Sequence, residues 1–141
     1  MYNPTLVQPM REELTTLGVK EMTSPEDVKT ELDDFSGTAL VVVNSVCGCA
    51  AGAARPAVAI ALRNEKLPEK LLTVFAGQDK EATDKARSYF TGYNPSSPSM
   101  GLLKEGQIVG MIQRQDIEGF SAEQISKKLT CLLYTSPSPR D

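Results

Sequence analysis

The stretch that decides the fold is TALVVVNSVCGCAAG, residues 38–52. Residues 38–43 are apolar at consecutive positions, which is typical of a strand covered on both faces in an α/β fold. An alanine-rich run that predicts a helix follows over residues 50–62. Cys47 and Cys49 therefore lie where a buried strand leads into a helix. The free N–H groups and the positive dipole end of such a helix lower the pKa of a thiol, so this junction favours a reactive cysteine.

Hydrophobic periodicity predicts the other elements around this junction. They are helices over residues 6–17 and 24–35, a strand over 38–43, a helix over 47–64 with a kink at Pro56, a strand over 71–75, a helix over 78–90, a hairpin over 100–112 and a helix from residue 121 through residue 129. Ser24, Asp79 and the pair Ser121 and Gln124 are expected helix caps. This order predicts an α/β fold with a mixed β-sheet and helices on both faces, preceded by two N-terminal helices.

Composition excludes several functional classes. The chain has 141 residues, a net charge of −3 and no histidine. The charge gives no basis for binding nucleic acid or an anionic membrane, and the lack of histidine excludes Ser-His-Asp and Cys-His catalysis. The apolar run over residues 39–62 could span a bilayer by length, but Arg55 near its middle makes that unfavourable.

The start of the sequence carries no basic segment followed by an apolar one, so we expect no secretory signal and a cytoplasmic protein. Three cysteines cannot all pair within one chain. Without export, a disulfide framework is not expected, and reactive or metal-binding thiols become the main interpretations.

Two cysteines separated by one residue allow several kinds of chemistry. Their Cα atoms can lie within disulfide range if Gly48 adopts an unusual turn, and such a strained disulfide suits thiol–disulfide exchange. Cys47, nearer the helix start, would attack and Cys49 would resolve. The alternatives are that both cysteines fill the core, hold half of a zinc site or a soft metal, or form a redox sensor without turnover.

Three segments resemble the bacilliredoxin family, which has a thioredoxin-like fold. They are VVVNSVCGCAAG with the following Ala54-Arg55-Pro56, VFAGQDKEAT at residues 74–83, and Tyr89 to Gly92 running on to PSSPS at residues 95–99. The resemblance implies a cytosolic thiol–disulfide oxidoreductase that removes bacillithiol from mixed disulfides on client proteins. It further implies bacillithiol as co-substrate, no bound cofactor and no metal. Protein disulfide isomerase activity is the alternative.

The resemblance also implies roles for individual residues. Cys47 would attack the bacillithiol sulfur, and Cys49 or free bacillithiol would resolve the adduct. The residues implied to contact the substrate are Gly48, Arg55, Ser97 and Pro98. Arg55 would stabilise the thiolate or the anionic groups of bacillithiol, with a simple helix-surface charge as the alternative. The Ser97–Pro98 peptide is expected to be cis and to face the cysteines. Gln115, between Arg114 and Asp116, stands where the family often has histidine, so the resemblance does not carry an acid–base role over to this position.

We expect one domain over residues 1–130. Residues 131–141 break the helical pattern and resemble the in-frame translation of a sequencing-library adapter. We therefore expect this tail to be non-native and Cys131 to carry no function. The expected partners are bacillithiolated client proteins and bacillithiol, and a homodimer is a further prediction.

Overall fold

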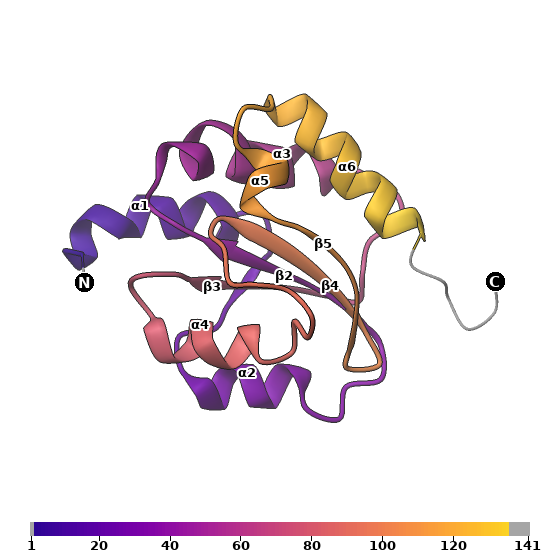
Figure 1. Ribbon diagram of the computed structural model, residues 1–141. Helices are drawn as coiled ribbons and strands as arrows, with labels where there is room; N and C mark the ends of the chain where they lie inside the picture. The colour runs from indigo at the N-terminus through magenta and orange to yellow at the C-terminus, as the bar shows by residue number, and fades with distance from the viewer. Residues whose placement is uncertain (1, 136–141) are drawn as a thin grey trace.

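The computed structural model describes residues 2–135, in which a central sheet lies between two layers of helices (Figure 1). The sheet has the strand order β1-β3-β2-β4-β5. Its strands are β1 (Lys20–Glu21), β2 (Thr38–Asn44), β3 (Lys70–Phe75), β4 (Ser99–Lys104) and β5 (Gln107–Ile112). β1 and β2 run parallel to β3, whereas β4 runs antiparallel to β2 and β5. The expected mixed sheet is confirmed.

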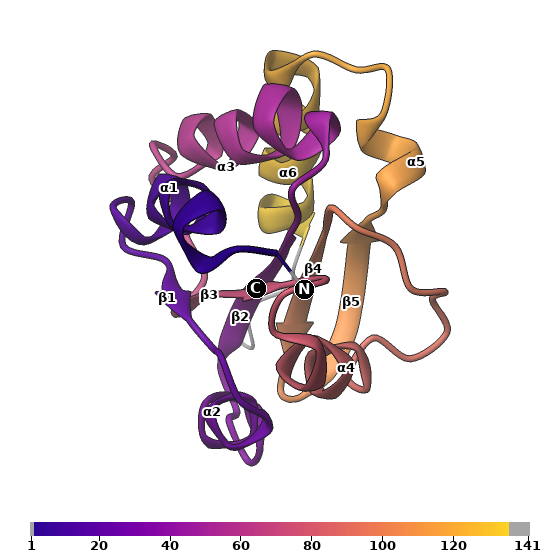
Figure 2. The same cartoon turned by 90° about the vertical axis from the view of Figure 1, so that its left-hand side faces the viewer.

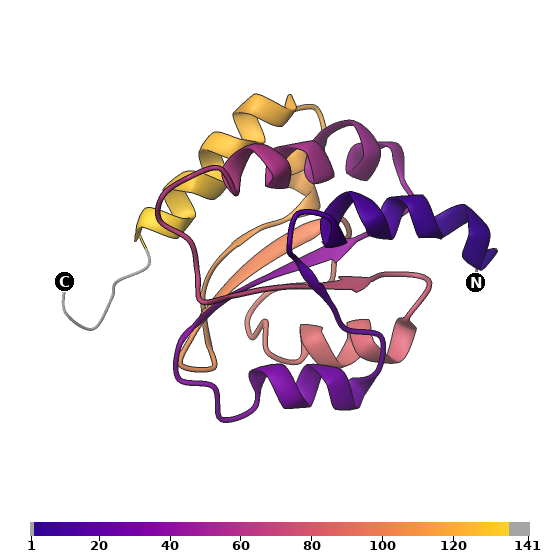
Figure 3. The same ribbon diagram turned by 180° about the vertical axis from the view of Figure 1, so that it is seen from behind.

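The helices cover both faces of this sheet. They are α1 (Pro4–Thr15), α2 (Pro25–Leu32), the π-helical η1 (Ala50–Ala54), α3 (Arg55–Ala61), α4 (Lys80–Arg87), α5 (Arg114–Ile117) and α6 (Ala122–Thr135). In Figure 1, α1, α3, α5 and α6 lie above the sheet and α2 and α4 lie below it. Figures 2 and 3 show the same two layers from the side and from behind. The two expected N-terminal helices, α1 and α2, are confirmed.

Strand β2 lies at the centre of both cores. Leu40 and Val42 belong to the apolar cluster that includes α3 and α6. Ala39, Val41 and Val43 belong to the opposite cluster, which includes α2 and α4. Because successive side chains of a strand point to opposite faces, a strand covered on both sides must be apolar at consecutive positions. The central strand expected from residues 38–43 is thereby confirmed.

Local polar contacts define several helix starts. The Ser24 hydroxyl accepts a backbone N–H of the first turn of α2 at 3.1 Å. Gln124 accepts the Ser121 N–H at 2.9 Å, and the Ser121 hydroxyl accepts the Gln124 N–H at 3.2 Å. Asp79 is the N-cap residue of α4, as expected, but its carboxylate makes no capping hydrogen bond and pairs with Arg11 at 2.7 Å.

The helix after β2 differs from the expected kinked α-helix. It contains the π-helical segment η1 directly before α3, and Pro56 lies in the first turn of α3. Proline lacks the N–H that would continue the α-helical ladder, which gives a physical reason for an irregularity here. The sequence pattern also missed β1 and α5, since elements of two and four residues carry too little periodicity to detect.

Helix α6 continues beyond the expected break at residue 131 and ends at Thr135. Leu133 is 4% exposed and joins the core cluster with α3. Residues 136–141, the rest of the expected tail, lie outside the described residues. Over residues 2–135, the structure contains no helix that is both long and apolar enough to cross a membrane.

Candidate active site

Cys47 lies between the end of β2 and the start of the next helix. Its carbonyl accepts the N–H groups of Ala50 at 3.0 Å and Ala51 at 3.2 Å, so it occupies the N-terminal turn. The side chain is half-buried, and both Cys47 and Cys49 are free thiols. The strand-to-helix junction expected from the sequence is therefore present, with a thiol at the helix end that favours negative charge.

The surroundings of Cys47 favour its thiolate. Burial alone would raise the pKa of the Cys47 thiol, but hydrogen bonds from the Ser45 hydroxyl and from the N–H groups of Ala50 and Cys49 outweigh it. The positive charge of Arg114 acts in the same direction, and the pKa of Cys47 falls below the ordinary value of a cysteine. The Ser45 Oγ also accepts the Cys47 N–H at 3.1 Å. Ser45 thus both positions Cys47 and stabilises its negative charge.

Cys49 has the opposite tendency. Burial, the nearby Cys47 and the carboxylate of Glu118 raise the pKa of the Cys49 thiol above its ordinary value. The Cys49 Sγ donates to the Glu118 Oε2 at 3.7 Å. At neutral pH the two thiols are therefore unequal, and Cys47 is the more nucleophilic because the thiolate is the attacking species.

Gly48 separates the two cysteines and is exposed. Its φ does not lie in the left-handed region, and a Cβ added there would meet no atom within 4 Å. The dithiol form therefore does not require glycine at this position. The unusual turn that we expected from Gly48 concerns the disulfide form.

Arg55 is buried beneath the reactive loop, the segment after β2 that carries Cys47, and 2% of its surface is exposed. It donates to the Asn44 Oδ1 at 2.9 Å and to the Ser45 carbonyl at 2.8 Å, and its Nε pairs with the Glu13 Oε1 at 3.0 Å. The alternative of a helix-surface charge is wrong, since the guanidinium points inward to these partners. The structure thus places Arg55 under the loop that carries Cys47, with its hydrogen bonds and its ion pair directed to Asn44, Ser45 and Glu13.

Ser97 and Pro98 begin the segment that faces the cysteine loop. Their peptide bond is cis, as expected. Pro98 is buried, whereas Ser97 is half-buried and borders the same depression as Cys47. The Ser97 carbonyl accepts the Arg114 Nη1 at 3.2 Å. Arg114 in turn pairs with the Glu118 Oε2 at 3.2 Å, so one arginine connects the proline loop to the carboxylate beside Cys49.

The depression beside Cys47 has a volume of ≈340 Å³. It is lined by Tyr2, Ser45, Val46, Cys47, Ala76, Gly77, Arg87, Ser97 and Arg114. Sequence reasoning found Cys47 and Ser97 but missed Ser45, Arg87 and Arg114 as site residues. Arg114 directly precedes Gln115, the position at which the resemblance pointed to a histidine, so a signal for it was present.

A metal centre finds no further support in the described part of the chain. Between residues 2 and 135, no group of three or more histidine, cysteine, aspartate or glutamate side chains is placed to hold an ion. Cys47 and Cys49 alone would supply half of a tetrahedral zinc site.

Comparison with known proteins agrees with this geometry. The family model described as disulphide isomerase matches residues 2–135. A bacilliredoxin of Koribacter versatilis is 55% identical over 130 residues, covering 92% of this chain and 90% of the relative. A bacilliredoxin of Bacillus licheniformis is likewise 55% identical over 130 residues, with the same shares covered. One of Staphylococcus epidermidis is 52% identical over 132 residues, covering 94% of this chain and 90% of the relative.

Solved structures show the same fold at low identity. The thioredoxin of Malassezia sympodialis has a TM-score of 0.56 and 15% identity, covering 82% of this chain and 88% of that one. The oxidised thioredoxin of Plasmodium falciparum has a TM-score of 0.54 and 18% identity, covering 82% and 97%. This chain therefore belongs to the disulphide isomerase family together with the bacilliredoxins, and it is a thiol–disulfide oxidoreductase with a thioredoxin-like fold.

Proposed function

We propose that this chain removes bacillithiol from mixed disulfides on client proteins in the cytoplasm. The observation that carries the proposal is the Cys47 thiol, whose pKa is lowered at a helix start that borders an open depression. The bacilliredoxin names of its relatives supply the substrate class. Bacillithiol is the proposed co-substrate, with no resident cofactor.

In the first step, the Cys47 thiolate attacks the bacillithiol sulfur of the mixed disulfide. A Cys47–bacillithiol disulfide forms, and the bond between bacillithiol and the client breaks. The client sulfur leaves as a thiolate and takes a proton from solvent, so the client is reduced and Cys47 is oxidised. Ser97, at the opposite rim of the depression, would contact the approaching client segment.

The second step clears the adduct from Cys47. The Cys49 thiol gives up its proton and attacks the Cys47 sulfur, which forms a Cys47–Cys49 disulfide and releases bacillithiol as a thiolate. Alternatively, a free bacillithiol thiolate attacks the adduct at the bacillithiol sulfur and releases the Cys47 thiolate with a bacillithiol disulfide. The raised pKa of Cys49 keeps it protonated while Cys47 makes the first attack.

The test uses a bacillithiolated client protein and intact mass spectrometry. Wild-type protein should lower the client mass by one bacillithiol, Cys47→Ser should abolish this change, and Cys49→Ser should retain the adduct on Cys47. Cys131→Ser removes an exposed thiol on α6 and should behave as wild type. Equal turnover by wild type and Cys47→Ser would refute the proposal. Disulfide isomerase activity, which the family description favours, would instead appear as recovery of a scrambled client with no bacillithiol present.

A further inference from the structure

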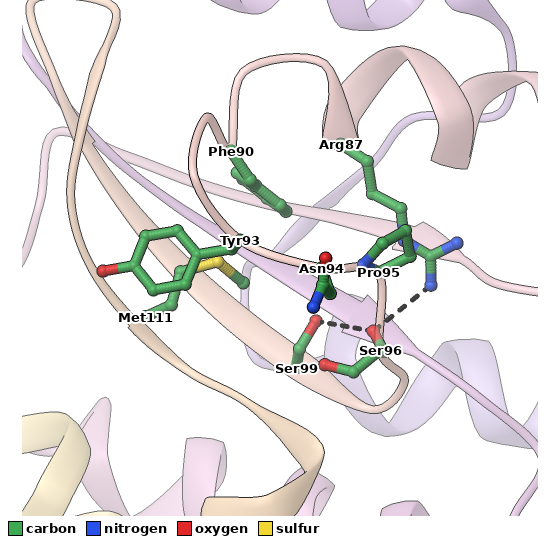
Figure 4. A pocket seen from close by; sticks show the side chains of 8 residues that line it. All are labelled: Arg87, Phe90, Tyr93, Asn94, Pro95, Ser96, Ser99 and Met111. Atoms are coloured by element: carbon green, nitrogen blue, oxygen red, sulfur yellow. Dashed lines mark hydrogen bonds between the residues drawn. The ribbon is translucent and has the colours of Figure 1, made fainter.

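Arg87 is a half-buried cation that lacks a carboxylate partner. It lies at the end of α4, and its Nη2 donates to the Ser96 carbonyl at 3.2 Å (Figure 4). Its Nε is buried and has no hydrogen-bond partner among the described residues. Burial lowers the pKa of this guanidinium, and the charge of Asp84 on the same helix opposes that effect only in part. A buried donor without a partner is unfavourable unless a ligand supplies one.

The other arginines with buried or half-buried side chains are paired. Arg11 contacts Glu21 and Asp79, each at 2.7 Å. Arg55 pairs with Glu13, and Arg114 pairs with Glu118. Within residues 2–135, no ion pair involves Arg87, so among these arginines its positive charge is the one without a carboxylate in direct contact.

Arg87 lies between two hollows. On one side it borders the depression of ≈340 Å³ that contains Cys47. On the other side it borders a hollow of ≈40 Å³ formed with Phe90, Tyr93 and the loop of residues 94–96 (Figure 4). The smaller hollow has room for only a few water molecules. A ligand large enough to carry both a sulfur and an anion must therefore approach Arg87 from the Cys47 side.

We propose that Arg87 binds the carboxylate of an anionic low-molecular-weight thiol while its sulfur is exchanged at Cys47. A guanidinium forms charge-assisted hydrogen bonds with a carboxylate, and the Arg87 side chain lines the depression that contains Cys47. Arg114, the other cation of the depression, is already held by Glu118 and Ser97. The inference rests on the proposed function, since it assigns the recognition of the small thiol at that same site.

The test compares two small disulfides of nearly equal shape. The anionic probe is 3,3′-dithiodipropionate and the neutral probe is its diamide. In each case the Cys47 thiolate attacks one sulfur, forms a mixed disulfide with it and releases the other sulfur as a thiolate. Cys49→Ser protein serves as background, because its adduct persists and its rate of formation can be followed by intact mass.

The measured quantity is the ratio of the second-order rate constant for the anionic probe to that for the neutral probe. Arg87→Gln should lower this ratio roughly three- to tenfold, as expected for the loss of one partly buried charge-assisted bond. Arg87→Lys should retain part of the ratio. Arg63→Gln removes the same charge from an exposed arginine in the turn after α3 and should leave the ratio unchanged.

An unchanged ratio in Arg87→Gln, or an equal fall in Arg63→Gln, would overturn the inference. The rate constant for the neutral probe reports whether the variant is still folded and reactive. The proposed function fails separately, if a bacillithiolated client is not reduced by wild-type protein although both small probes react. If Arg87→Gln slows only the reduction of a protein client and leaves the probe ratio unchanged, Arg87 recognises the client and the inference is wrong.

Discussion

The Cys49 Sγ donates to the Glu118 Oε2 at 3.7 Å, so the thiol that we propose to resolve the adduct points at a carboxylate. The negative charge of Glu118 disfavours a second negative charge on Cys49. The contact therefore raises the pH at which Cys49 ionises, which supports the proposed order in which Cys47 and Cys49 act.

Glu118→Gln should lower the pKa of Cys49, because it removes one of the negative charges that raise it. We expect the alkylation of Cys49 to begin at a lower pH, measured by iodoacetamide labelling and mass spectrometry in a Cys47→Ser background. Glu65→Gln, an exposed substitution in the loop after α3, is the control. If both variants titrate alike, Glu118 does not act on Cys49.

Ser45→Ala should raise the pKa of Cys47, since the Ser45 hydroxyl bonds to its sulfur. At pH 7 the alkylation rate of Cys47 should fall roughly fivefold, which corresponds to the loss of about one hydrogen bond. Stopped-flow alkylation in a Cys49→Ser background measures this rate. Ser36→Ala, in the loop before β2, should not change it, and an unchanged rate in Ser45→Ala would refute the role of the hydroxyl.

The lowered pKa of Cys47 links the stability of the reduced protein to pH. A thiol whose pKa is lower in the folded than in the unfolded chain adds stability above the unfolded pKa of about 8.5. This contribution is lost as pH falls through the folded pKa. Cys49→Ser protein should therefore gain stability from pH 6 to pH 9.5 relative to the variant that also carries Cys47→Ser. Urea unfolding in reducing buffer measures this difference, and a gap that shrinks with rising pH would contradict the pKa direction.

Arg55→Met should destabilise the fold by roughly 2–4 kcal/mol, because it leaves the Ser45 carbonyl without its buried donor and removes one of the two donors of the Asn44 amide oxygen. Glu13→Gln should cost less than about 1 kcal/mol, since the Glu13 side chain is 47% exposed and its ion pair is screened by solvent. Urea midpoints at constant slope give both values. A loss below 1 kcal/mol in Arg55→Met would show that the loop is held by other contacts.

Leu133→Ala should destabilise the fold by roughly 2–5 kcal/mol, because this side chain is 4% exposed within the cluster of α3 and α6. Cys131→Ser, on the exposed side of the same helix turn, should have little effect. Thermal and urea unfolding compare the two. Equal stability of Leu133→Ala and wild type would mean that the packing of Leu133 adds nothing to the fold.

Much of the fold follows from local pattern. The uninterrupted apolar run at residues 38–43 predicts a doubly covered strand, because only such a strand needs apolar side chains on both faces. The cysteine junction follows from the strand and helix signals on either side of it. The last turn of α6 could not be predicted from local pattern, because Leu132 and Leu133 pack against β5 and α3, which are remote in the sequence.

The residues of the site are harder to predict from the sequence than the elements of the fold. Arg55 was a predicted substrate contact close to Cys47 along the chain, yet its side chain points inward from the helix and is buried. Arg87 and Arg114 are remote in sequence and reach the depression because α4 follows β3 and α5 follows β5, two strands of one sheet that run in the same direction. The charge near a thiol depends on where charged side chains lie in the folded protein. The spacing of residues along the chain does not give these positions.

The first helix of the chain is joined to the reactive loop by polar contacts. The Asn44 amide donates to the Met10 carbonyl at 3.1 Å, and Glu13 pairs with Arg55. Tyr2, just before α1, borders the depression itself. We therefore expect an N-terminal tag or a shortened N-terminus to alter the reactivity of Cys47. The rate of Cys47 alkylation thus provides a sensitive assay for the integrity of a helix that contains no reactive group.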